Sequence, residues 1–175
     1  MSNILIKQME KQDVDGIMEI EKVSFGTYHW SRQSFLTEVN NQIGTYLTAI
    51  DKATNKVVGY CGFWLIIDEA HVTTIAVSPN YRGQNIGELL LQKMLQAGYT
   101  KKAKWFTLEV RASNVSAQGL YYKYNFKSLG SRRNYYQDNN EDALIMWTEN
   151  IWSESYKTMF ENNVKNLEIK GVEKV

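Results

Sequence analysis

The sequence contains one cysteine, one proline and two histidines among its 175 residues. A single cysteine excludes a disulfide within the chain, and its spacing from His29 and His71 does not resemble a zinc site. Cys61 lies in the apolar run VVGYCGFW, where a buried, unreactive thiol is expected rather than a nucleophile. We therefore predict no disulfide framework and no metal site.

Long apolar runs and an excess of one charge are also missing. No segment reaches the ~18 apolar residues of a membrane span, and the N-terminus MSNILIKQMEKQD lacks the positive-then-apolar pattern of a signal peptide. The formal net charge is +1, which does not favour nucleic-acid binding. We predict a cytoplasmic protein that binds neither membrane nor nucleic acid, and we expect a monomer or a weak homo-oligomer.

The apolar content is sufficient for a core, because 43% of the residues are hydrophobic and the length suits one domain. Strands are expected where β-formers are dense or alternate with polar residues, and helices where apolar residues recur every three to four positions. The expected strands are 4–9, 45–51, 56–67, 70–77, 104–110 and 142–148. The expected helices are 14–23, one that follows Ser31, and two that start near Gln84 and Asn114.

This order, with hairpin-linked strands followed by βαβα units and a closing hairpin, predicts an α/β (α+β mixed) fold with helices on the sheet faces. We assign this domain to residues 1–150. Residues 151–175 are polar with apolar positions at near-helical spacing. They predict an amphipathic helical extension that packs on its own domain.

A turn with two glycines precedes the third expected helix, in the stretch SPNYRGQNIGELL at 78–90. The first N–H groups of a helix have no partner within it, and the helix dipole adds about half a positive charge there. Such an end attracts phosphate. The spacing of RGQNIG matches neither the dinucleotide fingerprint nor the P-loop, so by itself the turn fits either a phosphate site or an ordinary loop-to-helix junction.

With its neighbours the turn resembles a known family. IAVSPNYRGQNIGELLL is similar to the strand, turn and helix of the GCN5-related N-acetyltransferases (GNAT), whose turn has the pattern Q/R-x-x-G-x-G/A, with Asn85 here at the first glycine. The resemblance implies the GNAT fold, a mixed, mostly antiparallel twisted sheet of about seven strands, with acetyl-CoA as co-substrate. It implies contacts to the pantetheine arm from Ile75, Ala76 and Val77, and a pyrophosphate cradle made by Arg82, Gly83, Gln84, Asn85, Ile86 and Gly87.

Further along, LEVRASNVSAQGLYYKYNF and SRRNYYQDNNEDALIMW resemble the RimI type of this family, enzymes that acetylate the N-terminal alanine of a small-subunit ribosomal protein. With EIEKVSF and DEAHVTTIAV, the resemblance extends from Ile4 to Glu149. It implies an acetyl-CoA-dependent N-α-acetyltransferase in which the amine of a protein N-terminus attacks the thioester directly. Where the RimI type usually has Pro-Trp-Ser, this chain has YHWS, and we expect its Trp30 to contact the acceptor.

The transfer needs a neutral amine, an oriented carbonyl and a proton for the leaving thiolate. Glu109, in the apolar strand KWFTLEV, is either a solvent-facing position or the general base, and the LEVRASN match favours the base. The resemblance places Tyr121 beside the coenzyme sulfur as general acid; the alternative is an aromatic on the buried stripe of its helix. Asn114 is expected both to contact the cofactor and to cap its helix.

The segment expected to join the last two strands is interpreted as an aromatic wall for the acceptor peptide, formed by Arg133, Tyr135 and Tyr136. The alternative is a plain solvated loop. We also hypothesise that Asp68 and Glu69, in the DEA turn, receive a basic peptide end.

Two other functions remain open at this point. One is acetylation of a lysine side chain, a polyamine or another small amine on the same scaffold. The other is a non-catalytic module that binds acyl-CoA or a partner through its C-terminal helix. The presence of both Glu109 and Tyr121 in matched positions favours the enzyme.

Overall fold

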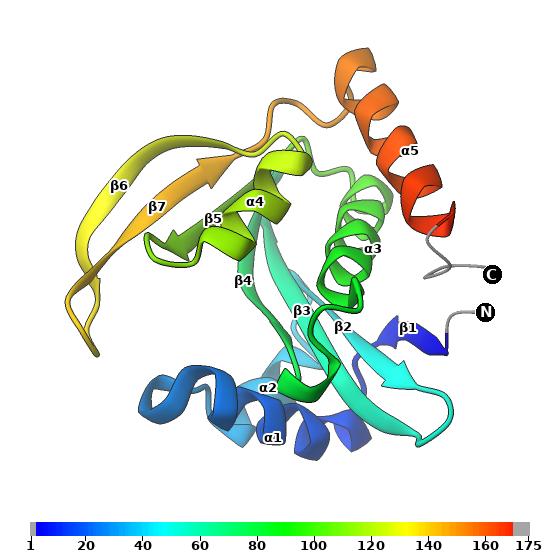
Figure 1. The fold of residues 1–175 in the computed structure, drawn as a ribbon, viewed down its shortest axis with the longest axis vertical. Coiled ribbons are helices and arrows are strands. Elements are labelled where there is room, and N and C mark those ends of the chain that lie inside the picture. Colours follow the sequence, from blue (N-terminus) through cyan, green and yellow to red (C-terminus); the bar gives the residue numbers. More distant parts are fainter. Residues whose placement is uncertain (1–2, 170–175) are drawn as a thin grey trace.

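The helices and strands follow the expected order in a computed structural model that describes residues 3–169 (Figure 1). The strands are β1 (Ile4–Gln8), β2 (Gly44–Asp51), β3 (Lys56–Ile66), β4 (Glu69–Val77), β5 (Trp105–Arg111), β6 (Lys127–Tyr136) and β7 (Glu141–Trp147). The helices are α1 (Val14–Phe25), α2 (Arg32–Glu38), α3 (Ile86–Thr100), α4 (Val115–Lys123) and α5 (Glu154–Ile169).

The seven strands form one sheet in the order β1-β2-β3-β4-β5-β7-β6. Among the described strands, only the central pair β4–β5 is parallel, and the other five pairings are antiparallel. The expected mixed, mostly antiparallel sheet is therefore confirmed. The single parallel contact arises because α3 carries the chain back across the sheet between β4 and β5, as a crossover helix must.

The sheet has a separate apolar core on each face. On one face, α3, α4 and α5 contribute buried side chains that include Leu90, Met94, Tyr121 and Tyr156. On the other, α1 and α2 pack Ile17 and Phe35 against the strands. Figure 1 shows α1 and α2 on the opposite side of the strands from α3. Helices on both faces confirm that part of the prediction too.

Two of the expected helix starts are set by the predicted caps. The Ser31 hydroxyl accepts a hydrogen bond from the Ser34 N–H at 3.0 Å, and the Asn114 side chain accepts one from the Ala117 N–H at 3.1 Å. Helix α3 starts at Ile86 rather than near Gln84, because Asn85 immediately before it has a left-handed backbone (φ 60°, ψ 13°) that cannot continue a helix.

The expected loop between the last two strands is mostly strand. Residues 131–136 belong to β6, where Ser131 and Arg132 pair with Leu144 and Ala143 of β7. The pairing loses register between Arg132 and Tyr136. Nearly every residue of β6 is exposed, so this edge strand has no alternation of buried and exposed side chains by which a sequence pattern could reveal it.

The C-terminal extension forms the expected amphipathic helix and packs on its own domain. Ile151, Tyr156 and Leu167 are fully buried, and Phe160 is nearly so. The Trp152 indole donates a hydrogen bond to the Ala103 carbonyl at 2.7 Å. The last residues of the predicted extension, 170–175, lie outside the described range.

Candidate active site

The parallel pair β4–β5 opens partway along its length. The strands pair only from Glu69 to His71 on β4, and beyond His71 no strand within residues 3–169 pairs with that edge. On its other edge β4 carries a bulge, because Thr73 has no partner in the β3 register. A bulge bends and twists a strand. The opening therefore leaves backbone N–H and C=O groups of β4 available to a ligand, up to Val77.

A cavity of about 360 Å³ lies at this opening. Its walls come from α1 and the turn after it, from β4, from β5 and the loop that follows, from α4 and from β6. They are Glu21, Ser24, Phe25, Tyr28, Trp30, Val72, Thr73, Thr74, Ile75, Leu108, Glu109, Val110, Arg111, Asn114, Tyr121, Tyr135 and Tyr136. Tyr121 packs in the core under α3 and α4, whereas Trp30 packs against the core under α1. The cavity thus reaches both faces of the sheet through the gap between β4 and β5.

This cavity brings together seven of the residues that the sequence singled out. They are Trp30, Ile75, Glu109, Asn114, Tyr121, Tyr135 and Tyr136. Both candidate catalytic residues are among them, so the chain arranges a carboxylate and a phenol around one space large enough for reacting groups.

Glu109 lies at the centre of β5, with its side chain 27% exposed. One carboxylate oxygen is 3.1 Å from a guanidinium nitrogen of Arg132 on β6. The sequence shows both Arg132 and Arg133 in this segment, and the predicted acceptor wall included only Arg133. With the segment expected to be a loop, no strand alternation separated the two. Arg133 does not line the cavity.

Tyr121 is 6% exposed and packs against Phe126, with ring centroids 5.6 Å apart. Burial raises the pKa of its phenol, which keeps the hydroxyl protonated under ordinary conditions. Tyr121 lines the cavity, and a protonated phenol can donate a hydrogen bond or a proton to a group bound there.

The glycine turn ends at the N-terminus of α3, a helix of 15 residues. Gly83 has φ 75° and Asn85 has φ 60°, both in the left-handed region. Glycine adopts it without strain and asparagine more readily than most residues. The Arg82 Nε donates a hydrogen bond to the Val77 carbonyl at 3.2 Å, which ties the turn to the end of β4. This turn adjoins the unpaired edge of β4 and presents first-turn N–H groups suited to an anion.

Aromatic rings form the α1 side of the cavity and its β6 wall. Trp30 packs 5.4 Å from Phe35 and 6.4 Å from Tyr46 between ring centroids. Tyr135 and Tyr136 contact each other edge to face at 5.2 Å. Burial raises the pKa of Tyr136 to about 12, so both its ring and its neutral hydroxyl contribute to the wall.

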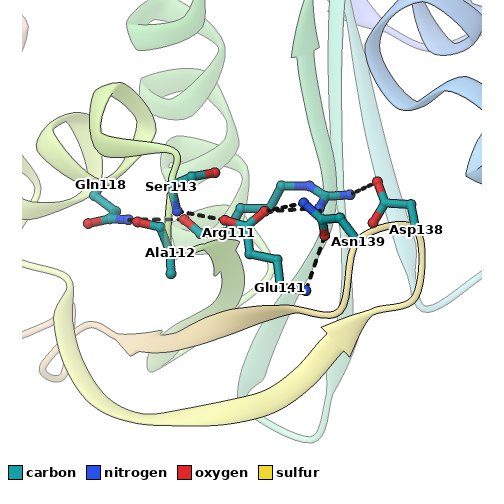
Figure 2. A network of polar contacts seen from close by, with 7 residues as sticks. All are labelled: Arg111, Ala112, Ser113, Gln118, Asp138, Asn139 and Glu141. Atoms are coloured by element: carbon teal, nitrogen blue, oxygen red, sulfur yellow. Dashed lines mark hydrogen bonds and ion pairs between the residues drawn. The ribbon is translucent and has the colours of Figure 1, made fainter.

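A polar network holds this wall against the loop that starts α4 (Figure 2). The Arg111 guanidinium donates to Asp138 at 2.8 Å and to Asn139 and Glu141 at 3.2 Å each. Glu141 also accepts from the Ser113 N–H at 2.7 Å. The same guanidinium stacks 3.9 Å over the Tyr136 ring. The network therefore fixes the β6–β7 end relative to β5 and α4.

Asp68 and Glu69 lie away from the cavity, at the closed end of the β4–β5 pair. Asp68 forms an ion pair with Lys104 at 2.9 Å, and Glu69 lies 3.2 Å from the His71 imidazole. Neither lines the cavity. Their carboxylates already have partners in the chain, and the structure does not bring them to the other candidate residues.

Glu21 of α1 lines the cavity and was not singled out from the sequence. It is 2% exposed, and one carboxylate oxygen accepts a hydrogen bond from the Trp30 N–H at 2.8 Å. Burial raises its pKa. A signal was present: with Val14, Ile17 and Met18 it occupies the i, i+3, i+4, i+7 stripe of the helix, where a carboxylate is out of place.

No helix in residues 3–169 is long and apolar enough to cross a membrane. In the same residues, no three His, Cys, Asp or Glu side chains gather in a way that could hold a metal ion.

The pattern that defines the acetyltransferase (GNAT) family matches residues 14–126. The chain is 43% identical over 142 residues to the putative [ribosomal protein bS18]-alanine N-acetyltransferase of Bacillus subtilis, an alignment covering 81% of this chain and 93% of the relative. It is 33% identical over 143 residues to the [ribosomal protein bS18]-alanine N-acetyltransferase of Escherichia coli K12, covering 81% of this chain and 94% of that one.

The fold has counterparts among solved structures as well. The crystal structure of the ribosomal-protein-S18-alanine N-acetyltransferase from Escherichia coli superposes with a TM-score of 0.74 at 29% identity. The superposition covers 83% of this chain and 92% of the other. The likeness therefore extends over most of the chain rather than over an isolated motif.

Proposed function

This chain belongs to the acetyltransferase (GNAT) family, and on that basis we propose that it transfers an acetyl group from acetyl-CoA to the N-terminal alanine of ribosomal protein bS18. The relatives that support this acceptor are matched over more than nine-tenths of their own length. With a ribosomal protein as acceptor, the enzyme would act in the cytoplasm.

One observation carries the proposal: a single cavity, at the gap between β4 and β5, is lined by both Glu109 and Tyr121. The gap gives access from both faces of the sheet. The N-terminus of α3 and the free edge of β4 lie on the coenzyme side, where Arg82 to Gly87 would hold the pyrophosphate and Ile75 to Val77 the pantetheine arm. The aromatic wall of Trp30, Tyr135 and Tyr136 lies on the acceptor side.

In the proposed reaction, Glu109 accepts a proton from the attacking amine while the amine nitrogen bonds to the acetyl carbon. The carbon–sulfur bond breaks, and Tyr121 donates its phenolic proton to the departing thiolate. Because burial raises the pKa of Tyr121, this proton leaves only as negative charge develops on the sulfur. Arg132, paired with Glu109, holds the carboxylate in position.

The acceptor's chemistry fits a carboxylate base. An α-amine has a reference pKa near 8, so roughly a quarter of it is neutral at about pH 7.5, against roughly 0.1% of a lysine side chain. Removing a proton from the α-amine is therefore the easier task, and a protein N-terminus is favoured over a lysine.

The test is an acetylation assay with acetyl-CoA and synthetic peptides that begin with alanine and reproduce the bS18 N-terminus. One peptide has a free α-amine, and a second is blocked there and carries an internal lysine. Mass spectrometry of the products is expected to show one acetyl group on the first peptide and none on the second.

Transfer only to the lysine, or only to a polyamine supplied in parallel, would replace this proposal with side-chain or small-amine acetylation. Coenzyme binding without transfer to any amine would instead indicate a non-catalytic module.

An Asp68→Lys/Glu69→Lys variant in the same assay tests the hypothesis that these carboxylates receive a basic peptide end. An unchanged KM for the peptide would refute that hypothesis.

A further inference from the structure

Three residues that line the same cavity each have a buried polar atom without a hydrogen-bond partner. Among the described residues, six buried side-chain atoms have no partner. Three of them belong to cavity-lining residues: Glu21 Oε2, Ser24 Oγ and Thr74 Oγ1. Buried polar groups normally find partners, and leaving one unpaired destabilises the folded state. Three such groups in residues that line one cavity point to a ligand that supplies the missing contacts.

Of these three residues, Glu21 gives the strongest indication of a bound cation. Its other carboxylate oxygen accepts the Trp30 N–H at 2.8 Å, which fixes the side chain toward the turn that follows α1. Burial raises its pKa, so the carboxylate is held at a cost that a cation beside Oε2 would offset. Of the other charged groups that line the cavity, Glu109 and Arg111 already have ionic partners.

We propose that Glu21, with the hydroxyls of Ser24 and Thr74, forms the subsite that receives the ammonium group of the acceptor's first residue. This inference rests on the proposed function and names the residues that recognise its substrate. An ammonium has three N–H donors and no acceptor, which matches a carboxylate oxygen and two hydroxyl oxygens. Phe25, Tyr28 and Trp30 also line the cavity, and aromatic rings attract cations to their faces.

The positions of Thr74, Glu21 and Glu109 suit a reaction in which the amine first binds and then loses its proton. Thr74 is next to Ile75 at the open edge of β4, so a group held there lies beside the space proposed for the thioester. Glu21 receives the amine in its charged form, and Glu109, on the β5 side, takes up the proton. Glu21 therefore contributes to binding and selection, and Glu109 to the chemical step.

The experiment compares the binding of two ligands to the wild type and to three variants. The first ligand is the alanine-first bS18 peptide, and the second is its des-amino analogue, in which the α-amine is replaced by hydrogen. The wild type is expected to bind the amine peptide roughly 10- to 100-fold more tightly, the range for a hydrogen bond to a charged group. Glu21→Gln should remove most of that preference and raise the acceptor KM, with little effect on the acetyl-CoA KM. Ser24→Ala and Thr74→Val should each have a smaller effect in the same direction.

Two control variants separate binding from structure. Glu19→Gln changes an exposed carboxylate on the same helix, and Tyr60→Phe removes another unpaired buried hydroxyl that does not line the cavity. Both should keep the wild-type preference. Thermal unfolding and the acetyl-CoA KM check that Glu21→Gln is folded.

If the wild type acetylates the peptide but Glu21→Gln keeps the full preference for the amine, the subsite is elsewhere and only this inference fails. If the wild type acetylates no N-terminal amine, the proposed function fails first. A loss of binding for both ligands alike in Glu21→Gln would show that the residue supports the fold rather than recognising the amine.

Discussion

The two carboxylates of the cavity differ in what surrounds them. Glu109 is partly exposed and paired with Arg132, whereas Glu21 is almost fully buried with one oxygen unpaired. Glu109 could be named from the sequence because it interrupts an apolar strand inside a matched motif. Glu21 could not be named in the same way, because only the fold shows that the stripe of α1 ends at a cavity. Arg132 and Arg133 could not be separated without the pairing of β6 with β7.

At the residue scale, Glu109→Gln should lower kcat by roughly 10²- to 10⁴-fold, the usual contribution of a general base. The acetyl-CoA KM should not change, since the residues proposed to hold the coenzyme lie on β4 and at the start of α3. The deficit should shrink as pH rises past about 8, where the α-amine loses its proton without help. Steady-state kinetics between neutral and alkaline pH measures both effects.

A loss of activity that is independent of pH would argue against a base and for a role of Glu109 in positioning. Tyr121→Phe provides the comparison, because it removes a proton donor to the thiolate and not an acceptor from the amine. Its deficit should therefore not be relieved by raising the pH.

At the element scale, the β6–β7 hairpin is a part of the fold that the sequence predicted only incompletely. The length of β6 could not be predicted, since an exposed edge strand has no buried face to give its residues a period of two. The start of α3 could be located to within two residues from the glycine turn. The left-handed backbone at Asn85 shows why asparagine can stand where the family pattern has glycine.

The hairpin depends on Glu141, whose pKa falls from the ordinary value of 4.5 to about 2. Hydrogen bonds from Ser113 are the main cause, followed by those from Asn139 and Arg111. A lowered pKa means that the ionised form is favoured by folding, so this stabilisation is present above about pH 4.5 and is lost as the pH falls toward about 2.

Glu141→Gln should therefore lower the free energy of unfolding at neutral pH, and its difference from the wild type should shrink as the pH falls below about 4.5. Urea unfolding of both proteins at several pH values between neutral and about 3 measures that difference. Other carboxylates titrate equally in both proteins and cancel. A difference that stays constant with pH would show that Glu141 acts by packing alone.

At the scale of the whole molecule, α5 lies beyond the residues that match the family and yet joins its core. The Tyr99 hydroxyl of α3 donates to the Ile151 carbonyl at 2.6 Å, and Asn163 of α5 donates to the Lys123 carbonyl at the end of α4 at 2.9 Å. The Phe160 ring packs against Tyr99 and Tyr124, with centroids 5.8 and 6.3 Å away. The helix thus joins the ends of α3 and α4, on the side of the fold away from α1 and the acceptor wall.

Phe160→Ala tests whether the packing of α5 stabilises the core. Removing a buried ring typically costs about 3–5 kcal/mol, which for a chain of this size lowers the unfolding midpoint by on the order of 10 °C. Below that midpoint kcat and both KM values should stay at their wild-type levels, because Phe160 does not line the cavity.

The control is Asn162→Ala, which changes an exposed residue of the same helix and should leave the unfolding midpoint nearly unchanged. An unaltered midpoint in Phe160→Ala would mean that α5 does not stabilise the core, whereas a lower kcat at full folding would mean that α5 also sets the position of α4 and with it the hydroxyl of Tyr121.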